Sequence, residues 1–430
     1  MPQESLPFSV SLELALGGPG ACPRPAFDSA LARAESGLSW LREQHKARSL
    51  QLLDVPSRSD DLAAAQSVVD AYCKDTSDVA VLGIGGSSLG GQALKALEAA
   101  GRKGPRVTFH DNPDPESWQA AMAGFDLKTS RFIVISKSGG TAETLMQALT
   151  AADAIERAGG GKYLKYHFAI VTEPKPSPLR AFAESIGAPV LDHPMGVGGR
   201  YSVLTIVGAL PALIMGLDVK ALRAGAQIVL DEALTRIAKD VPAVCGAALH
   251  HALAAEGRLH QTVLWAYADK LATLSGWWRQ LWAESLGKSG KGSTPVGAVG
   301  PVDQHSQLQL FRDGPGQALF TIVSTETKGK GLIAPPERAN ALNLQYLAGK
   351  AMGDLVAAEA RATAETLSRN KRPVRQIHVP MIDERSMGAL MMHFMLETIL
   401  MGRLMGVDPF DQPGVEEGKV LARQYLAERK

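Results

Sequence analysis

The feature that most constrains this 430-residue chain is a strand–loop–helix pattern that recurs along its first half. Short apolar runs predict strands, and they occupy residues 78–82, 107–110, 131–135 and 167–172. The first and third of these runs lead into loops rich in Gly and Ser, and each loop opens a helical stretch. Because repeated units of this kind build a parallel sheet with helices on both faces, the sequence predicts an α/β fold.

The remaining chain predicts helical arms and a second, smaller α/β unit. Apolar periodicity predicts helices over 27–52 and 60–74, and a helical stretch over 202–256 broken near Pro211 and Pro242. Strands are then expected at 262–267, 319–324 and 375–379, helices at 271–286 and 339–367, a Gly-rich segment up to Pro301, and two final helices. We therefore expect an N-terminal helical segment (1–55), a larger domain (56–215), a smaller domain (216–390) and C-terminal helices (391–430).

Composition excludes several classes of protein. Lys and Arg number 45 against 44 Asp and Glu, so the chain lacks the basic excess of a nucleic-acid binder. The three cysteines are far apart and have no CxxC spacing, which argues against a disulfide framework or a zinc site. No secretory signal is visible, and the most apolar stretch, 201–217, contains Pro211 and is interpreted as a buried helix. We expect a cytoplasmic protein with no nucleic-acid or membrane partner.

Two predicted loops carry the pattern of an anion site. Residues 83–91 and the run Ser136-Lys-Ser-Gly-Gly-Thr141 place backbone N–H groups, hydroxyls and the Lys137 ammonium where a helix begins. For either loop alone, Ser and Thr could simply cap a helix. Because both loops follow strands of one predicted sheet, where such sheets bind ligands, a phosphate site is favoured. The dinucleotide fingerprint and the Walker spacing both fail here.

A predicted helix near residue 280 carries a candidate base. Gln280 and Glu284 are four residues apart and share one helix face. Three of the six tryptophans lie in this stretch: Trp277, Trp278 and Trp282. Such apolar surroundings would raise the pKa of the Glu284 carboxyl and make it a better base. From this helix alone, a surface Glu paired with Lys288 is the favoured alternative. The histidines show no metal-ligand spacing, so no metal is assigned.

Several separated motifs together resemble one family, glucose-6-phosphate isomerase (phosphoglucose isomerase), of the compact bacterial type. They begin at Gly83, Ser136, Gly198, Gln280, Asp303 and Phe410, and read GIGGSSLG, SKSGGTAET, GGRYS, QLWAESLGK, DQH and FDQPGVEEGK. They span 83–419 in the family's order. The resemblance implies two sugar-isomerase domains, each a mostly parallel sheet flanked by helices, and no cofactor. It also implies a homodimer with shared active sites and a place in glycolysis and gluconeogenesis.

The resemblance further implies a role for each matching residue. It assigns Glu284 as the base that moves a proton between C2 and C1, and Arg200 as the cation that stabilises the enediolate. His305 with Lys419 would assist opening of the sugar ring. The substrate would be held by Gly86, Ser87, Ser136, Lys137, Ser138, Thr141, Glu143, Gln280 and Gln412. The residue types suit aldose–ketose isomerisation, which needs a positioned carboxylate and a cation near the developing oxyanion.

The sequence departs from the family pattern beside the proposed residues. Ala283 replaces a common Met, Pro413 a common Trp and Glu417 an apolar residue, and the usual lead-in to Asp303 is missing. Every proposed catalytic residue is in place. Two alternatives remain: an isomerase of broader specificity that includes mannose 6-phosphate, and a non-catalytic sugar-phosphate-binding regulator, which usually carries a DNA-binding domain.

Overall fold

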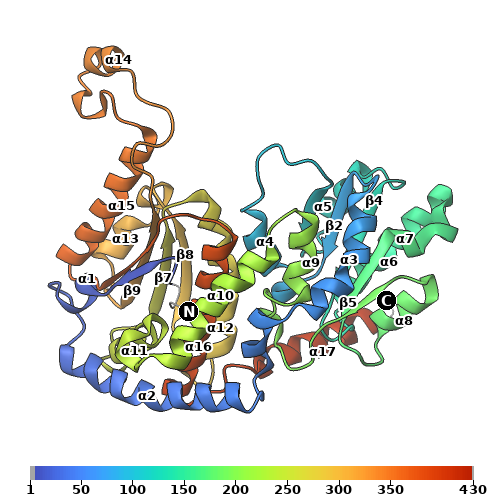
Figure 1. Cartoon of the computed structure of the whole chain (residues 1–430), viewed down its shortest axis with the longest axis horizontal. Helices are drawn as coiled ribbons and strands as arrows, with labels where there is room; N and C mark the ends of the chain where they lie inside the picture. Colours follow the sequence, from blue (N-terminus) through green and yellow to red (C-terminus); the bar gives the residue numbers. More distant parts are fainter. Residues whose placement is uncertain (1–4, 429–430) are drawn as a thin grey trace.

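The computed structural model describes residues 5–428 and contains two five-stranded sheets, which lie side by side in Figure 1. The first sheet has the order β3-β2-β4-β5-β6 and is parallel throughout. Its strands are β2 (Asp78–Leu82), β3 (Arg106–His110), β4 (Ser130–Ile135), β5 (Phe168–Thr172) and β6 (Val190–Asp192). The predicted α/β class is confirmed.

Helices cover both faces of the first sheet. Side chains alternate along β2, so that Val79 and Val81 enter one core while Ala80 and Leu82 enter another. The helices around this sheet are α3 (Asp60–Cys73), α4 (Leu89–Lys95), α5 (Pro115–Gly124), α6 (Ala142–Ile155), α7 (Leu164–His167), α8 (Pro178–Ile186) and α9 (Ile206–Ile214). Pro211 lies inside α9 rather than at a break, and the chain instead turns at Gly216, whose φ is +73°.

The second sheet repeats the strand order of the first. Its order, read from its own edge, is β8-β7-β9-β10-β1, with β1 antiparallel to β10. The strands are β7 (Gln261–Ala266), β8 (Thr294–Val299), β9 (Ala318–Thr325), β10 (Val374–Val379) and β1 (Ser9–Ser11). In both sheets the first strand of the unit lies between the second and the third. The halves are therefore alike in architecture, as expected, although no sequence repeat is visible.

Helices of the second unit come from two parts of the chain, residues 13–46 and 219–405. They are α1 (Glu13–Leu16), α2 (Arg24–Lys46), α10 (Val219–Thr235), α11 (Pro242–Ala255), α12 (Ala272–Leu286), α13 (Leu308–Asp313), α14 (Pro336–Ala341), α15 (Met352–Arg369) and α16 (Glu384–Met405). The backbones of α10 and α16 touch: a Cβ on Gly225 would lie 1.8 Å from the Arg385 carbonyl oxygen, and one on Gly388 equally close to that of Leu222.

Four sequence-based expectations about elements are wrong. The helix expected over 27–52 ends at Lys46 and is followed by a 3-10 helix, η1 (Gln51–Ser57). The Gly-rich segment before Pro301, for which no strand was expected, contains strand β8. The helix expected over 339–367 is interrupted between α14 and α15, because Asn343 and Gly349 have positive φ. The N-terminal segment also contributes a strand, β1. The predicted domain boundaries stay a prediction.

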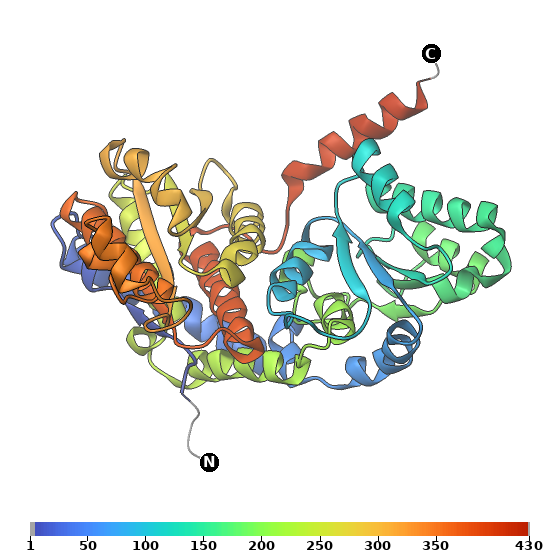
Figure 2. The same cartoon turned by 90° about the horizontal axis from the view of Figure 1, so that it is seen from above.

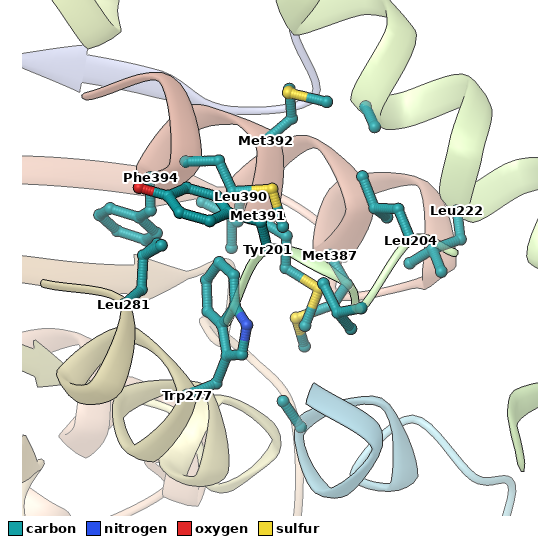
Figure 3. Packing of buried hydrophobic residues seen from close by; sticks show 14 of the residues in the cluster. Tyr201, Leu204, Leu222, Trp277, Leu281, Met387, Leu390, Met391, Met392 and Phe394 are labelled. Carbon is teal, nitrogen blue, oxygen red and sulfur yellow. The ribbon is translucent and has the colours of Figure 1, made fainter. Parts of the chain in front are cut away.

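The largest hydrophobic core joins the two units. Trp277 and Leu281 of α12 face Met391 and Phe394 of α16, with Tyr201 from the first unit beside them (Figure 3). Because this single cluster includes side chains of β2 and β4 as well as of β7 and β10, the two sheets are held by one continuous packing. The carboxyl edge of the first sheet is thereby fixed relative to α12.

The chain ends in helix α17 (Glu416–Ala427), which leads away from the junction of the two units toward the first one (Figure 2). None of its residues is buried. A second projection, the segment 326–351 with α14, stands out from the second unit in Figure 1. Within residues 5–428, no helix is both long and apolar enough to cross a membrane.

Candidate active site

The two Gly/Ser loops meet at one edge, as the sequence predicts. Strands β2 and β4 are neighbours and parallel, so the loops that follow them both leave from the carboxyl edge of the first sheet. In the second loop, the hydroxyl oxygens of Ser136 and Thr141 are 2.9 Å apart, and the Ser138 hydroxyl accepts a hydrogen bond from Gly140 N–H at 3.2 Å. Hydroxyls and backbone N–H groups therefore converge at the N-terminus of α6.

Lys137 has a carboxylate neighbour that the sequence analysis did not anticipate. Its Nζ lies 3.8 Å from Oε1 of Glu173, a buried residue directly after β5 that also pairs with Lys175. The Lys137 side chain remains 38% exposed. The contact is long for an ion pair, so the ammonium is placed beside the loop and is still accessible to an anion.

Arg200 forms the centre of the site. It lies in η5 (Gly199–Tyr201), a single 3-10 turn packed directly against the first loop: a Cβ on Gly86 would lie 2.2 Å from the carbonyl carbon of Gly199. Its side chain is buried, and its Nη1 donates to Glu284 Oε2 at 3.2 Å and to Gln412 Oε1 at 2.8 Å. Residues from three distant parts of the chain therefore meet at one guanidinium group.

Helix α12 presents Gln280 and Glu284 together on the side facing the first loop. Gln280 Nε2 donates to Glu284 Oε1 at 3.3 Å, and a Cβ on Gly85 would lie 2.8 Å from the Gln280 amide nitrogen. The Glu284 side chain is 31% exposed, so the carboxylate is both paired and accessible. The shared helix face predicted for these residues is confirmed.

The described partners of Glu284 are polar. The three tryptophans of α12 are buried in the largest hydrophobic core, and the carboxylate is hydrogen-bonded to Arg200 and Gln280. The alternative pairing with Lys288 is not observed, because Lys288 Nζ lies 2.8 Å from Asp411 Oδ1. The carboxylate is therefore paired with a guanidinium and not with the Lys288 ammonium.

Gln280 and Gln412 bond directly to the group formed by Arg200 and Glu284, and Gly86 packs against the turn that carries Arg200. Three other predicted residues lie outside both this group and the second loop. His305 follows the 3-10 turn η8 (Val302–Gln304), and its side chain is exposed. Lys419 of α17 is exposed and pairs with Glu416 at 2.7 Å, and Glu143 is exposed in the first turn of α6. Within residues 5–428, none of these three side chains bonds to Arg200 or Glu284.

The sequence analysis missed the groups that hold Arg200 from behind. Arg200 Nε donates to Ser285 Oγ at 2.8 Å, and Nη2 donates to the carbonyl oxygens of Pro409 and Asp411 at 2.6 and 2.9 Å. The Tyr201 hydroxyl reaches Ser285 Oγ at 3.0 Å and the Pro409 carbonyl at 3.2 Å. Ser285 directly follows Glu284 in the QLWAESLGK motif, so its place in that motif was the one available sign of its role.

Comparison with known proteins agrees with this geometry. The phosphoglucose isomerase family model matches residues 63–430. The chain belongs to the phosphoglucose isomerase family. The glucose-6-phosphate isomerase of Rubrobacter xylanophilus is 38% identical over 373 residues, covering 85% of this chain and 86% of that protein. A glucose-6-phosphate isomerase of Thermus thermophilus is 36% identical over 414 residues, covering 94% and 98%.

Two solved structures have the same fold as this member of the phosphoglucose isomerase family. A hypothetical protein from Thermus thermophilus superimposes with a TM-score of 0.86 at 34% identity, covering 98% of this chain and 100% of that one. A glucose-6-phosphate isomerase from Chlamydia trachomatis has a TM-score of 0.83 at 20% identity, covering 98% and 89%. The resemblance drawn from the sequence motifs is confirmed.

Proposed function

We propose that this protein interconverts D-glucose 6-phosphate and D-fructose 6-phosphate through a cis-enediol, in the cytoplasm, as a step of glycolysis and gluconeogenesis. The observation that carries the proposal is an accessible carboxylate, Glu284, held 3.2 Å from the buried guanidinium of Arg200 beside two anion-binding loops. A carboxylate next to a fixed cation is what proton transfer beside a carbonyl requires.

Proton transfer in this proposal uses one carboxylate twice. Glu284 takes the proton from C2 of the open-chain aldose, and the electron pair moves to give an enediolate whose negative charge lies on the C1 oxygen. The same carboxylic acid then returns its proton to C1, while the proton of the C2 hydroxyl passes to the C1 oxygen, so that C2 becomes the ketose carbonyl and C1 carries a hydroxyl. The Arg200 guanidinium stabilises the enediolate oxygen.

The phosphate of the substrate would bind the two loops. Ser87, Ser136, Ser138 and Thr141 offer hydroxyl donors, and Lys137 offers an ammonium that is still partly exposed. The N-terminus of α6 adds the positive end of a helix dipole. The backbone N–H of Gly86 belongs to the same edge, and Gln280, Glu143 and Gln412 would line the sugar.

Ring opening would use His305 with Lys419, and we propose that the second of two subunits completes each site. In support, the projecting segment 326–351 leaves Leu332, Leu342 and Tyr346 between 69% and 80% exposed. The fully exposed α17 likewise carries Tyr425 and Leu426 at 64% and 78%. Exposed apolar side chains gathered on projections are typical of protein interfaces, so a homodimer accounts for them.

The test is an assay of the purified protein with glucose 6-phosphate, in which formation of fructose 6-phosphate is followed with and without a chelator. We expect turnover that survives the chelator. Glu284→Gln should lower kcat at least about 100-fold, the size of a general base contribution. Glu35→Gln, on an exposed position of α2, is the matched control and should retain full activity. Binding without turnover by the unmodified protein would contradict the proposal.

A further inference from the structure

We propose that Ser285 and Tyr201 are positioning residues, whose buried hydroxyl groups hold the Arg200 guanidinium with its Nη1 edge toward Glu284. This inference rests on the proposed isomerase function and adds residues to it, because neither side chain reaches Glu284 or the anion-binding loops through any described contact. Both hydroxyl-bearing residues are buried, with exposures of 0% for Ser285 and 1% for Tyr201.

Each N–H donor of the Arg200 guanidinium has an acceptor in the protein. A guanidinium has five N–H donors, and the structure provides five acceptors within 3.2 Å. Nε donates to Ser285 and the two Nη2 hydrogens to backbone carbonyls at 409 and 411. The two Nη1 hydrogens point to Glu284 and Gln412. One edge of the guanidinium is therefore bound to the scaffold and only the Nη1 edge faces the site.

The direction of every hydrogen bond behind Arg200 follows from the chemistry of the groups. Arg200 can only donate and the Pro409 carbonyl can only accept. Tyr201 OH therefore donates to Pro409, the Ser285 hydroxyl donates to Tyr201, and Ser285 accepts from Arg200 Nε. Burial raises the pKa of Tyr201 to about 12, which keeps the phenol protonated as this order requires. The result is a closed ring of four groups with one possible arrangement of hydrogens.

This ring has a consequence for catalysis. An enediolate oxygen binds Arg200 by replacing a site-facing acceptor at Nη1, because all five N–H groups have acceptors within the protein. During that exchange the plane of the guanidinium is kept by Ser285, Pro409 and Asp411. Without the Ser285 hydroxyl, Nε loses its acceptor, and the side chain can rotate toward another one. The guanidinium then loses its fixed orientation, whereas the affinity for the substrate is kept.

The kinetic test uses Ser285→Ala and Tyr201→Phe in the full-length enzyme. We expect kcat for glucose 6-phosphate to fall about 10- to 100-fold in Ser285→Ala, the size expected for a displaced catalytic group, while KM changes less than about threefold. Tyr201→Phe keeps the buried ring and should lower kcat in the same way by a smaller factor. The double variant should equal Ser285→Ala alone, because both residues act through one ring. Values of kcat within twofold of the unmodified enzyme would overturn the proposal.

A matched control separates positioning from stability. Tyr72→Phe removes another buried tyrosine hydroxyl, one that donates to the Phe132 carbonyl at 3.3 Å and has no described contact with the Arg200 group. It should lower the melting temperature about as much as Tyr201→Phe and leave kcat unchanged. Equal losses of kcat in both tyrosine variants would mean that a general loss of stability, and not positioning, explains the effect.

A second measurement needs no substrate. The Arg200 Nε–H signal in ¹H–¹⁵N spectra, assigned by its absence in Arg200→Lys, should exchange slowly with water in the unmodified protein. In Ser285→Ala it should exchange at least about tenfold faster, because the buried acceptor is gone. An unchanged exchange rate would overturn the positioning role. This result stands whether or not the protein isomerises glucose 6-phosphate, so failure of the proposed function is distinguishable from failure of this inference.

Discussion

At the scale of single residues, Arg200 shows how a buried charge is made tolerable. Its exposure is 3%, and an unpaired guanidinium would be costly at that depth. Five acceptors compensate it, and two of them belong to side chains that face the site. The same bonds that stabilise the fold therefore place a permanent positive charge beside Glu284.

Replacing Arg200 with Lys should separate charge from geometry. Lysine keeps the positive charge and has three donors instead of five, so at least two buried acceptors lose their partner. We expect kcat to fall at least about 100-fold, and the free energy of unfolding to drop by about 1–3 kcal/mol. Assays of kcat and urea unfolding measure the two effects. Arg24→Lys, in an exposed pair with Asp28, should change neither; full activity of Arg200→Lys would contradict the role of geometry.

Residue types were easier to predict than residue surroundings. The motif containing Glu284 identified the base candidate correctly as a helix residue beside Gln280, because four-residue spacing fixes a shared face. The sequence could not show that the tryptophans next to it point into the core. Which face of α12 is buried depends on how the helix packs against α16. The acceptors at Pro409 and Asp411 were invisible for a similar reason: they are backbone carbonyls and leave no side-chain signature.

At the scale of elements, the contact between two glycine-containing turns positions the centre of the site. Gly86 in η2 (Gly85–Ser87) lies directly against the backbone of Gly199 in η5, and a Cβ at position 86 would clash with that backbone. The sequence-based view explained the glycines of the first loop, including Gly86, as sources of free N–H groups. The structure adds a packing role, because the turn that carries Arg200 lies directly on the turn that carries Ser87.

Gly86→Ala tests this contact. The added Cβ would lie 2.2–2.6 Å from backbone atoms of residues 199 and 200, so η5 has to move. We expect a loss of about 1–3 kcal/mol in the free energy of unfolding from overpacking, and a fall in kcat of about tenfold or more from displacement of Arg200. Gly276→Ala on α12 is the matched control, since a Cβ there meets nothing within 4 Å. It should stabilise the protein by about 0.5–1 kcal/mol; the same kcat loss in both variants would refute the explanation.

Elements with clear periodicity were predicted well, and those with mixed signals were not. Strands β2, β4 and β5 are buried on both faces and read as continuous apolar runs. Strand β8 contains Pro295 and Gly297 and lies at a sheet edge, where such residues are tolerated, so its sequence looked like a loop. The break between α14 and α15 depends on positive φ at Asn343 and Gly349, which a helical pattern does not reveal.

At the scale of the whole molecule, the proposed sharing of active sites predicts complementation between inactive enzymes. Glu284→Gln and His305→Ala proteins should each be inactive, and a mixed dimer should regain one intact site. Random exchange of subunits restores about a quarter of all sites. The measurement is activity against mixing time, with subunit exchange followed by a tag on one variant. Complete exchange without recovered activity would show that each site is built from one chain.

Stability of the molecule should fall on acidification because several buried histidines are held neutral. Burial lowers the pKa of His193 to about 4, whereas an unfolded histidine titrates near 6.5. Below pH 6.5 the unfolded state therefore binds more protons, and the free energy of unfolding decreases as pH falls toward 4. His193 alone accounts for about 2 kcal/mol between pH 7 and pH 5. The pKa values of four more histidines are also lowered, mainly by burial: His110, His167, His251 and His393.

Urea unfolding at pH 7 and pH 5 checks this expectation. His193→Gln should reduce the difference between the two pH values, because glutamine does not titrate and can still donate to the Pro194 carbonyl, as Nδ1 of His193 does. His260→Gln removes an exposed imidazole and should leave the difference as it is. Equal stability of the unmodified protein at the two pH values would contradict the prediction.

The edge strand β1, near the beginning of the chain, pairs with β10, which is synthesised much later. Ser11 pairs with Gln376, so the second sheet gains its last strand only after nearly the whole polypeptide has left the ribosome. At about 5–20 residues per second, the first residues wait roughly 20–70 seconds for their partner. During synthesis the first sheet, whose strands lie between residues 78 and 192, has all its parts much earlier. The nascent chain therefore contains every strand of the first sheet while the other half and the Glu284 helix are still being made.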